Sequence, residues 1–333
     1  MKYPSLRPLA GAFACALALA VTATPAVAEK KIRIATIAAS NSPWHKAMNR
    51  FAEVAAAESN KELAVSVFTD GQLGDINQMY SSMQLGTLEM GYFGLGAIVL
   101  LKGAEPMNIA YVPYLFKSKE SSVKVLNSPE FLKIYDDIAA KTGVRIVGAY
   151  GERSPRALQT TKGPIVKPED VKGLRLRIPN IELLKATFEK LGAQVTPLGM
   201  LEIYTALSRG TVQGQDNGFD LSMPLKFNEV APYWSATDHA YELTGWFMSE
   251  KTWKSLSDAE RKALTKAAQA GGEVSTAETR KLDAASIETV RKTGTYTVPD
   301  IPAFRAALKD VHVPYEGKLW PAGMVDRVRK MQE

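Results

Sequence analysis

The sequence predicts an α/β protein made of two domains with a ligand cleft between them. Segments that alternate like strands are followed by segments with helical periodicity, in two successive sets, which favours parallel strand pairing. The chain has 333 residues, and the part after residue 28 exceeds the size at which a single core usually stops growing. No low-complexity tract or Pro/Ser-rich linker separates the two sets. We therefore expect short crossing segments, at Gly148–Gly151 and Tyr241–Trp246, with a cleft between the domains.

Residues 1–28 have the pattern of a signal peptide. Lys2 and Arg7 precede the apolar run LAGAFACALALAV, which is shorter than the ~20 residues that a transmembrane helix needs. Small residues then end at Ala28, where we expect cleavage and release into the periplasm. The only cysteine, Cys15, lies inside this segment, so the mature chain has no disulfide or thiol chemistry. Lipidation of Cys15 is an alternative, but the apolar run continues past it.

The first set of elements alternates strands and helices. Ser42 with Pro43 is typical of a helix start, and Asp75 and Gly86 predict the start and end of another helix. The expected elements are, in order, a strand at 31–37, a helix from 43, a strand at 63–68, a helix at 76–85 and a strand at 88–94.

The second set follows the strand expected at 144–151. It should contain a strand at 174–178, a helix at 181–190, a strand at 193–198, a helix at about 200–208 and a strand at 211–216. A mostly helical part comes last. Ser257 and Glu260 form a capping box that predicts a helix to about residue 291, with a bend at Gly271-Gly272.

No catalytic or cofactor-binding motif stands out along the chain. The stretches typical of nucleophile elbows, phosphate loops and zinc proteases are absent, and GLGAIVLLKG lacks the glycine spacing of a dinucleotide site. The three histidines are far apart, so no metal cluster is expected. A net charge of +6 with interspersed signs does not favour nucleic acid. We expect no cofactor and no enzyme activity, although a periplasmic enzyme that acts on a carboxylate remains the alternative.

The stretch GLRLRIPN, residues 173–180, is the most informative about a site. Three apolar residues alternate with Arg175 and Arg177, and Pro179 ends the strand, so both guanidinium groups should point away from a core. Ligands of open α/β sheets bind beyond the carboxyl ends of strands, and a guanidinium is the best side-chain fork for a carboxylate. A solvated strand face is the alternative. Arg156 in SPRALQTT is a second candidate, with an exposed loop arginine as its alternative.

Two long stretches, RALQTTKGPIVKPEDVKGLRLRIPN and LGAQVTPLGMLEIYTALSRGTVQGQDN, resemble the DctP family of TRAP-transporter solute-binding proteins. GQLGD, LGTLEMGY and ATDH fit the same family in the same order. The resemblance implies a two-lobe periplasmic binding protein fold with a long helix across both lobes. One lobe would hold residues 29–153 and about 243–282, and the other 154–242 and about 283–333. Such a receptor would act as a monomer that captures an organic acid and delivers it to a membrane permease.

The resemblance also assigns roles to single residues. Arg177 would hold the ligand carboxylate, Asn217 would face the same group, and Arg156 and Asn180 would lie nearby. His239 matches a family histidine near the second crossing, with core packing as its alternative. The ligand would be a C4-dicarboxylate, a hydroxy acid or a sugar acid, and the sequence does not choose between them.

Departures from the family pattern concern the walls of the pocket. Gln213 stands where aspartate is common, and NGFD stands where proline usually follows the asparagine, so Gly218-Phe219 would reshape one wall. Gly94 and Ile37 stand at positions where sialic-acid binders carry other residues, which argues against sialic acid as the ligand. Apolar residues that could line the cavity, with core packing as the alternative for each, are Trp44, Tyr92, Phe93, Met200 and Phe219.

Overall fold

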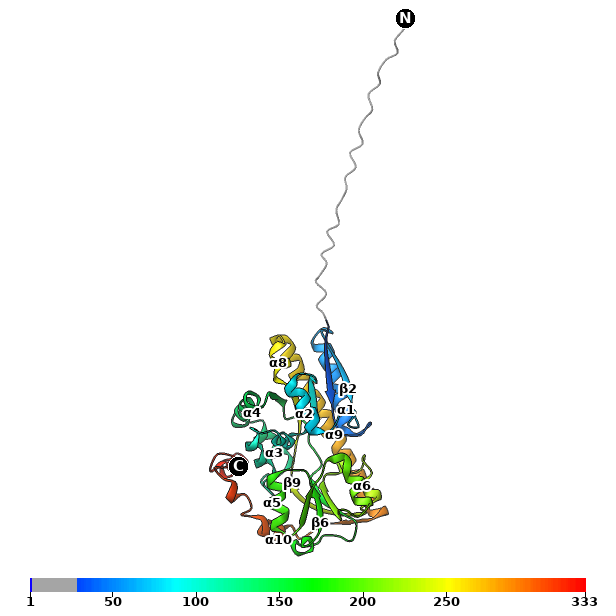
Figure 1. Ribbon diagram of the computed structural model, residues 1–333, viewed down its shortest axis with the longest axis vertical. Helices are drawn as coiled ribbons and strands as arrows, with labels where there is room; N and C mark the ends of the chain where they lie inside the picture. Colours follow the sequence, from blue (N-terminus) through cyan, green and yellow to red (C-terminus); the bar gives the residue numbers. More distant parts are fainter. Residues whose placement is uncertain (2–28) are drawn as a thin grey trace.

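The computed structural model describes Met1 and residues 29–333, which form two α/β lobes stacked along the long axis of the molecule (Figure 1). The predicted signal peptide lies in residues 2–28, outside the described residues. Each lobe is built around one sheet, and the two sheets have five and six strands. In the described part of the chain, no helix combines the length and apolar character needed to cross a membrane.

The first lobe has a mixed sheet in the order β2-β1-β3-β10-β4. Strand β1 is parallel to β2 and β3, whereas β10 is antiparallel to β3 and β4. Its strands are β1 (Lys30–Ala35), β2 (Leu63–Phe68), β3 (Met90–Gly94), β4 (Val144–Gly148) and β10 (Thr244–Ser249). Its helices are α1 (Pro43–Glu58), α2 (Ile76–Leu85), η1 (Leu95–Leu100), η2 (Glu105–Tyr111), α3 (Lys119–Leu126), α4 (Pro129–Thr142) and α8 (Glu250–Ser255).

The second lobe has a sheet in the order β11-β9-β5-β8-β6-β7. Its strands are β5 (Arg156–Thr160), β6 (Arg175–Ile178), β7 (Gln194–Pro197), β8 (Gly214–Asn217), β9 (Tyr233–Ala240) and β11 (Thr295–Thr297). Its shorter helical segments are η3 (Pro168–Val171), α5 (Glu182–Lys190), η4 (Met200–Glu202), α6 (Ile203–Ser208), α7 (Phe219–Ser222), η5 (Phe227–Glu229) and α10 (Ile301–Leu308). Strand β6 lies inside the sheet and is parallel to both neighbours.

Two crossing segments connect the lobes where the sequence predicts them. The chain leaves the first sheet after β4 and returns to it before β10. Glu152 and Leu243 form an isolated antiparallel bridge between the two segments, and the Arg153 amide donates to the Glu242 carbonyl at 3.1 Å. The crossings therefore run side by side and form a narrow connection between the lobes.

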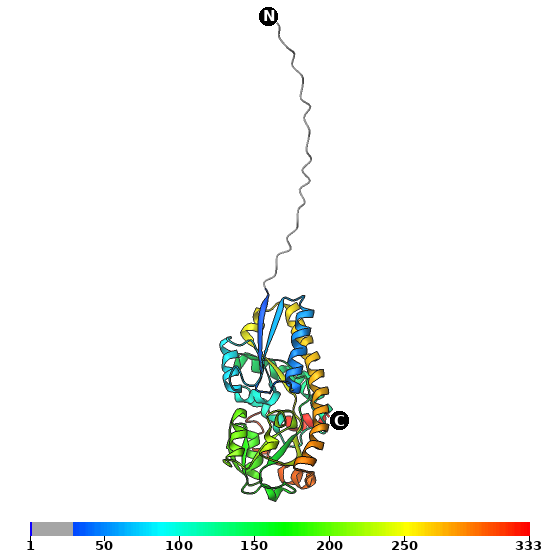
Figure 2. The ribbon, with the colours of Figure 1, turned by 90° about the vertical axis from the view of Figure 1, so that its right-hand side faces the viewer.

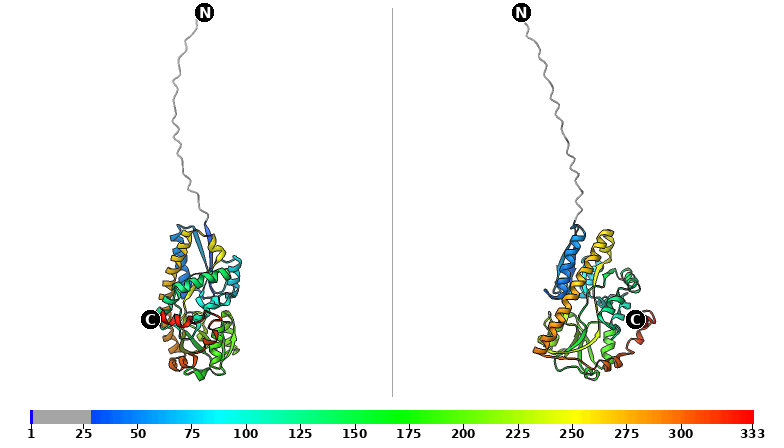
Figure 3. Two further views of the ribbon diagram at one scale, coloured as in Figure 1. Left: turned by 90° about the vertical axis from the view of Figure 1, so that its left-hand side faces the viewer. Right: turned by 180° about the vertical axis from the view of Figure 1, so that it is seen from behind.

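A 36-residue helix, α9 (Asp258–Thr293), runs along both lobes (Figures 2 and 3). It begins at the predicted capping box and contacts α1 and β4 in the first lobe and α7 and β11 in the second. Gly271-Gly272 do not interrupt the helix, which continues through both residues, and the bend there stays a prediction. These glycines instead permit close packing: a Cβ at Gly272 would lie 2.4 Å from Tyr150 Cβ, and one at Gly271 would lie 2.6 Å from the Trp246 ring.

The last residues return to the first lobe. They form η6 (Val313–Tyr315) and α11 (Met324–Lys330), where Arg327 pairs with Glu130 at 3.0 Å. The Gln332 side chain also bonds to the backbone of Leu115 and Lys117. The same segment also contacts the second lobe, since Tyr315 Oη donates to Glu182 of α5 at 3.2 Å, and the lobe boundaries stay a prediction.

Candidate functional site

A cavity of about 590 Å³ lies between the two lobes. This volume is in the range of small-molecule sites, about 300–1,000 Å³. The first lobe contributes Trp44 from α1, the start of α2, parts of η1, and Tyr111. The second lobe contributes Arg156, the carboxyl ends of β6 and β8, and residues 197–202. Both lobes therefore supply walls, as expected for a site that forms when two lobes meet.

Arg177 stands at the carboxyl end of β6, on the cavity wall, and is 2 % exposed. Its Nε and Nη2 donate to the Leu198 carbonyl at 2.9 and 2.6 Å, whereas Nη1 is buried and has no hydrogen-bond partner. Among the described residues no carboxylate lies within ion-pair distance of this guanidinium. Burial, together with the charge of Arg156, lowers the pKa of Arg177 to about 9, so it remains a cation at neutral pH. A buried, unpaired cation is costly unless an anion joins it.

Arg175, two residues earlier on the same face of β6, has a different environment. Its side chain is exposed and donates to the Gly210 and Thr211 carbonyls at 2.7 and 3.2 Å. The sequence predicts that both guanidinium groups point away from a core, whereas the structure buries Arg177 and exposes Arg175. The structure separates them because the segment after β7, which includes Leu198, folds over the carboxyl end of β6 only.

Arg156, the first residue of β5, is buried and fully paired. Its guanidinium contacts Asp216 and Glu242 at 2.7 Å each and lies over the Tyr111 ring at 5.7 Å. Burial opposes ionisation of Asp216, but Arg156 and His239 hold the pKa of that carboxyl well below its ordinary value. Arg156 thus lines the cavity with its charge already neutralised by protein carboxylates.

His239 lies behind Arg156 rather than on the cavity wall. Its Nε2 is 3.1 Å from Asp216 Oδ1, its Nδ1 is 2.8 Å from Thr237 Oγ1, and its ring packs edge-on against Phe188. These contacts fit a ring whose Nε2–H donates to Asp216. His239 therefore helps to position Asp216, which in turn pairs with Arg156. We propose no ligand contact for His239.

Arg153, in the first crossing segment, lines the cavity and was not singled out from the sequence. It donates to Asp220 at 2.8 Å, to Glu242 at 2.7 Å and to Asn217 Oδ1 at 3.1 Å. Its guanidinium lies 5.1 Å from the centre of the Trp44 ring, and Trp44 Nε1 donates to the same Asp220. The available signal was the short spacing of two arginines, ERSPR, at a crossing.

The remaining predicted residues divide between the cavity and the core. Asn217, Asn180, Met200 and Trp44 line the cavity. Because Arg153 occupies Asn217 Oδ1, the amide nitrogen of Asn217 is left with only a weak 3.7 Å contact to the Met200 sulfur.

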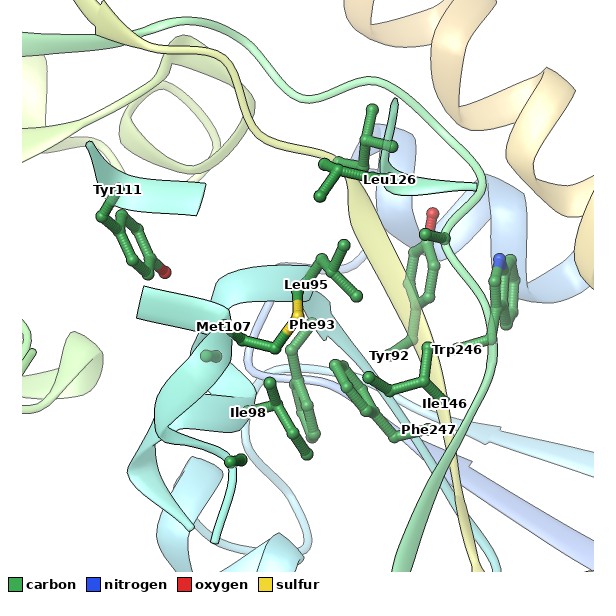
Figure 4. Close-up of a cluster of buried hydrophobic side chains, with 14 of the residues drawn as sticks. Tyr92, Phe93, Leu95, Ile98, Met107, Tyr111, Leu126, Ile146, Trp246 and Phe247 are labelled. Atoms are coloured by element: carbon green, nitrogen blue, oxygen red, sulfur yellow. The ribbon is translucent and has the colours of Figure 1, made fainter. Parts of the chain in front are cut away.

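Phe93 and Phe219 do not line the cavity. Phe93 packs in the first lobe's core, stacked on Phe247 at 5.8 Å (Figure 4), together with Tyr92. Phe219 stacks on Trp234 at 3.7 Å. Each aromatic ring buries more apolar area there than it would on a cavity wall. Wall residues that sequence reasoning missed are Asp75 and Asn77 at the start of α2, and Leu100, Tyr111, Leu201 and Glu202 on the short 3-10 turns η1, η2 and η4.

The site chemistry suits anion binding. Within residues 29–333, no group of three His, Cys, Asp or Glu side chains is placed to hold a metal ion. What the lining residues offer, within the described part of the chain, is one cationic group without a carboxylate partner, an amide nitrogen on the same cavity wall, and walls that come from two separate lobes.

The model of the bacterial extracellular solute-binding proteins, family 7 (DctP), matches residues 34–318. The chain belongs to this family. A solute-binding protein of Roseobacter denitrificans is 32 % identical over 303 residues, 90 % of each chain. The C4-dicarboxylate-binding periplasmic protein of Rhodobacter capsulatus is 26 % identical over 316 residues, 94 % of this chain and 93 % of the other.

A solved TRAP solute-binding protein from Roseobacter denitrificans, with bound L-galactonate, superposes with a TM-score of 0.83. It is 28 % identical, and the match covers 92 % of this DctP-family chain and 100 % of the other. The predicted family and the two-lobe α/β fold are therefore confirmed, and the chain is a solute-binding protein of the TRAP type.

Proposed function

We propose that this protein is a periplasmic receptor that captures a small organic acid through an Arg177–carboxylate pair and delivers it to the TRAP membrane permease. The observation that supports the clamp is the buried Nη1 of Arg177, which lacks a partner beside a cavity between two lobes. Asn217 would donate its free amide N–H to the same carboxylate. Arg156 and Arg153 would hold Asn217 and the cavity wall in place through Asp216, Asp220 and Glu242.

Closure of the lobes would strengthen this pairing. Water is excluded when the lobes meet, and the attraction between unlike charges grows as the local dielectric constant falls. The ligand shifts the balance between open and closed forms only by binding the closed form more tightly. Reversible capture needs no bond chemistry, so an added acid should be recovered unchanged after long incubation.

The relatives support an acid as the ligand. One related structure holds L-galactonate, and another relative is named for C4-dicarboxylate binding. Both ligand classes offer the carboxylate that Arg177 would need. We further propose that the protein works as a monomer, after export and cleavage at Ala28.

The Arg177 clamp can be tested by calorimetry on ligand-stripped protein with an acid that binds the wild type. Arg177→Met would leave the carboxylate without its partner, a loss of about 2–5 kcal/mol, or roughly 30-fold to several-thousand-fold in affinity. The matched control is Arg175→Met, which removes the same side chain from the exposed end of the same strand. Equal affinities for wild type and Arg177→Met, or equal losses for both variants, would reject the clamp.

A further inference from the structure

We infer that the cavity takes a monocarboxylate with a neutral body and discriminates against dicarboxylates, an inference that rests on the proposed function. Three arginines line the cavity, and by count they could hold two carboxylates. Their partners decide otherwise, because only Arg177 has a charge that no protein carboxylate offsets.

Arg153 and Arg156 are joined by one shared carboxylate. Glu242 Oε2 accepts from Arg153 Nη1 and from Arg156 Nη1, each at 2.7 Å. Asp220 pairs with Arg153 at 2.8 Å, and Asp216 pairs with Arg156 at 2.7 Å. The three negative charges of these carboxylates therefore already exceed the two positive charges of Arg153 and Arg156.

These carboxylates are held in place and cannot easily make room for a ligand. Asp216 and Asp220 are 0 % exposed and Glu242 is 3 % exposed. Trp44 donates to Asp220 and His239 lies within hydrogen-bond distance of Asp216, at the same oxygens that the arginines contact. A ligand carboxylate that replaced one of them at its arginine would leave a buried negative charge without its partner, which is strongly unfavourable.

No other cation on the wall could receive a second negative end. The remaining charged side chains that line the cavity are Asp75 and Glu202. Asp75 accepts from the Gln78 amide at 2.9 Å, and Glu202 accepts from the Gly199 amide at 2.8 Å. A second carboxylate placed there would meet like charge.

The same part of the cavity suits a neutral body. Asn77 and Asn180 present amides, and Ile76, Leu100 and Leu198 present apolar surface. Hydroxyl, carbonyl or alkyl groups could be bound there without a counter-charge. The structure thus favours aldonate-like or other hydroxy monocarboxylates over the dicarboxylates that some relatives take.

The test uses pairs of acids that differ only in one charge, measured by calorimetry at pH 7.5. The pairs are succinamate with succinate, and galactonate with galactarate; a thermal-shift screen of mono- and dicarboxylates covers other skeletons. We expect the monocarboxylate to bind at least about tenfold more tightly in every pair that binds. A dicarboxylate that binds as tightly as its partner, or leads the screen, would overturn the inference while leaving the Arg177 clamp intact. If no acid binds or stabilises the protein, the proposed function fails and takes this inference with it.

A variant tests the cause of the preference. Glu242→Gln removes the shared charge, so the ratio of dicarboxylate to monocarboxylate affinity should rise about tenfold or more. Glu250→Gln, which pairs with Arg145 in the first lobe, should leave the ratio unchanged. If Glu242→Gln does not fold, Asp220→Asn takes its place, because it also removes a negative charge from this cluster. An unchanged ratio in a folded Glu242→Gln or Asp220→Asn variant would overturn the inference.

Discussion

Asp216 should make the protein sensitive to acid. Burial disfavours its charge, but Arg156 and His239 hold the pKa of Asp216 below the value of an unfolded chain, about 3.9. A group whose pKa is lower in the folded state stabilises the fold above the unfolded pKa, and this contribution is lost as pH falls. Asp216→Asn should cost about 3–5 kcal/mol at pH 7, because it leaves Arg156 with one partner fewer, and about 1 kcal/mol less at pH 3, where the contribution has begun to be lost.

Urea unfolding at pH 7, 5, 4 and 3 measures this difference. Asp136→Asn is the control, since Asp136 is 69 % exposed in its pair with Arg145 and such a pair contributes about 0–1 kcal/mol. If the difference in free energy of unfolding between wild type and Asp216→Asn stays constant from pH 7 to pH 3, the proposed role of this charge is wrong.

At the scale of single residues, sequence reasoning could nominate arginines but not distinguish them. Arg177 and Arg156 are both buried on the cavity wall, yet one is unpaired and the other has two carboxylate partners. Those partners, Asp216 and Glu242, come from segments 60 and 86 residues further along the chain. Local patterns carry no information about such pairing, which is also why Arg153 was missed.

The long helix α9 should be intolerant of side chains where it passes closest to the first crossing. An alanine in a helix is favoured over glycine by about 1 kcal/mol, so Gly272→Ala would stabilise an exposed helix. Here the added Cβ would lie 2.4 Å from Tyr150 Cβ and 2.9 Å from the Gly151 nitrogen, and the backbone cannot yield as a flexible side chain would. Overpacking typically costs about 1–3 kcal/mol, so we expect net destabilisation.

Chemical unfolding of Gly272→Ala measures the net effect. Glu273→Ala, on the exposed side of the same turn, is the control and should change stability by no more than about 0.5 kcal/mol. A variant Gly272→Ala that is as stable as the wild type would show that the helix and the crossing can move apart.

Elements with strong local signals could be predicted, and those without could not. The capping boxes at Ser257 and Asp75 mark the starts of α9 and α2 in the structure. Gly271-Gly272 give no local signal of their role, because a glycine pair that breaks a helix and one that admits a close neighbour look alike in sequence; here the helix continues through both. The short turns η1 and η4, which line the cavity, have no period to detect.

On the scale of the whole molecule, the two lobes make an apolar contact beside the cavity. Leu201, in η4 of the second lobe, lies against Gly71 in the loop that precedes α2 of the first, where a Cβ would be 2.9 Å from Leu201 Cδ1. Leu201 also lines the cavity and is 50 % exposed.

We therefore expect Leu201→Ala to speed ligand release without lowering the stability of the free protein. Half of the side chain is already exposed, so truncation costs little in folding, but the closed form loses an apolar contact of about 1 kcal/mol. The dissociation rate should rise roughly fivefold, with little change in the association rate. Tyr204→Ala is the control, because Tyr204 is 38 % exposed on the neighbouring α6 but lies outside the cavity wall. Stopped-flow measurement of both rates decides the point: equal dissociation rates for wild type and Leu201→Ala would mean that closure does not depend on this contact.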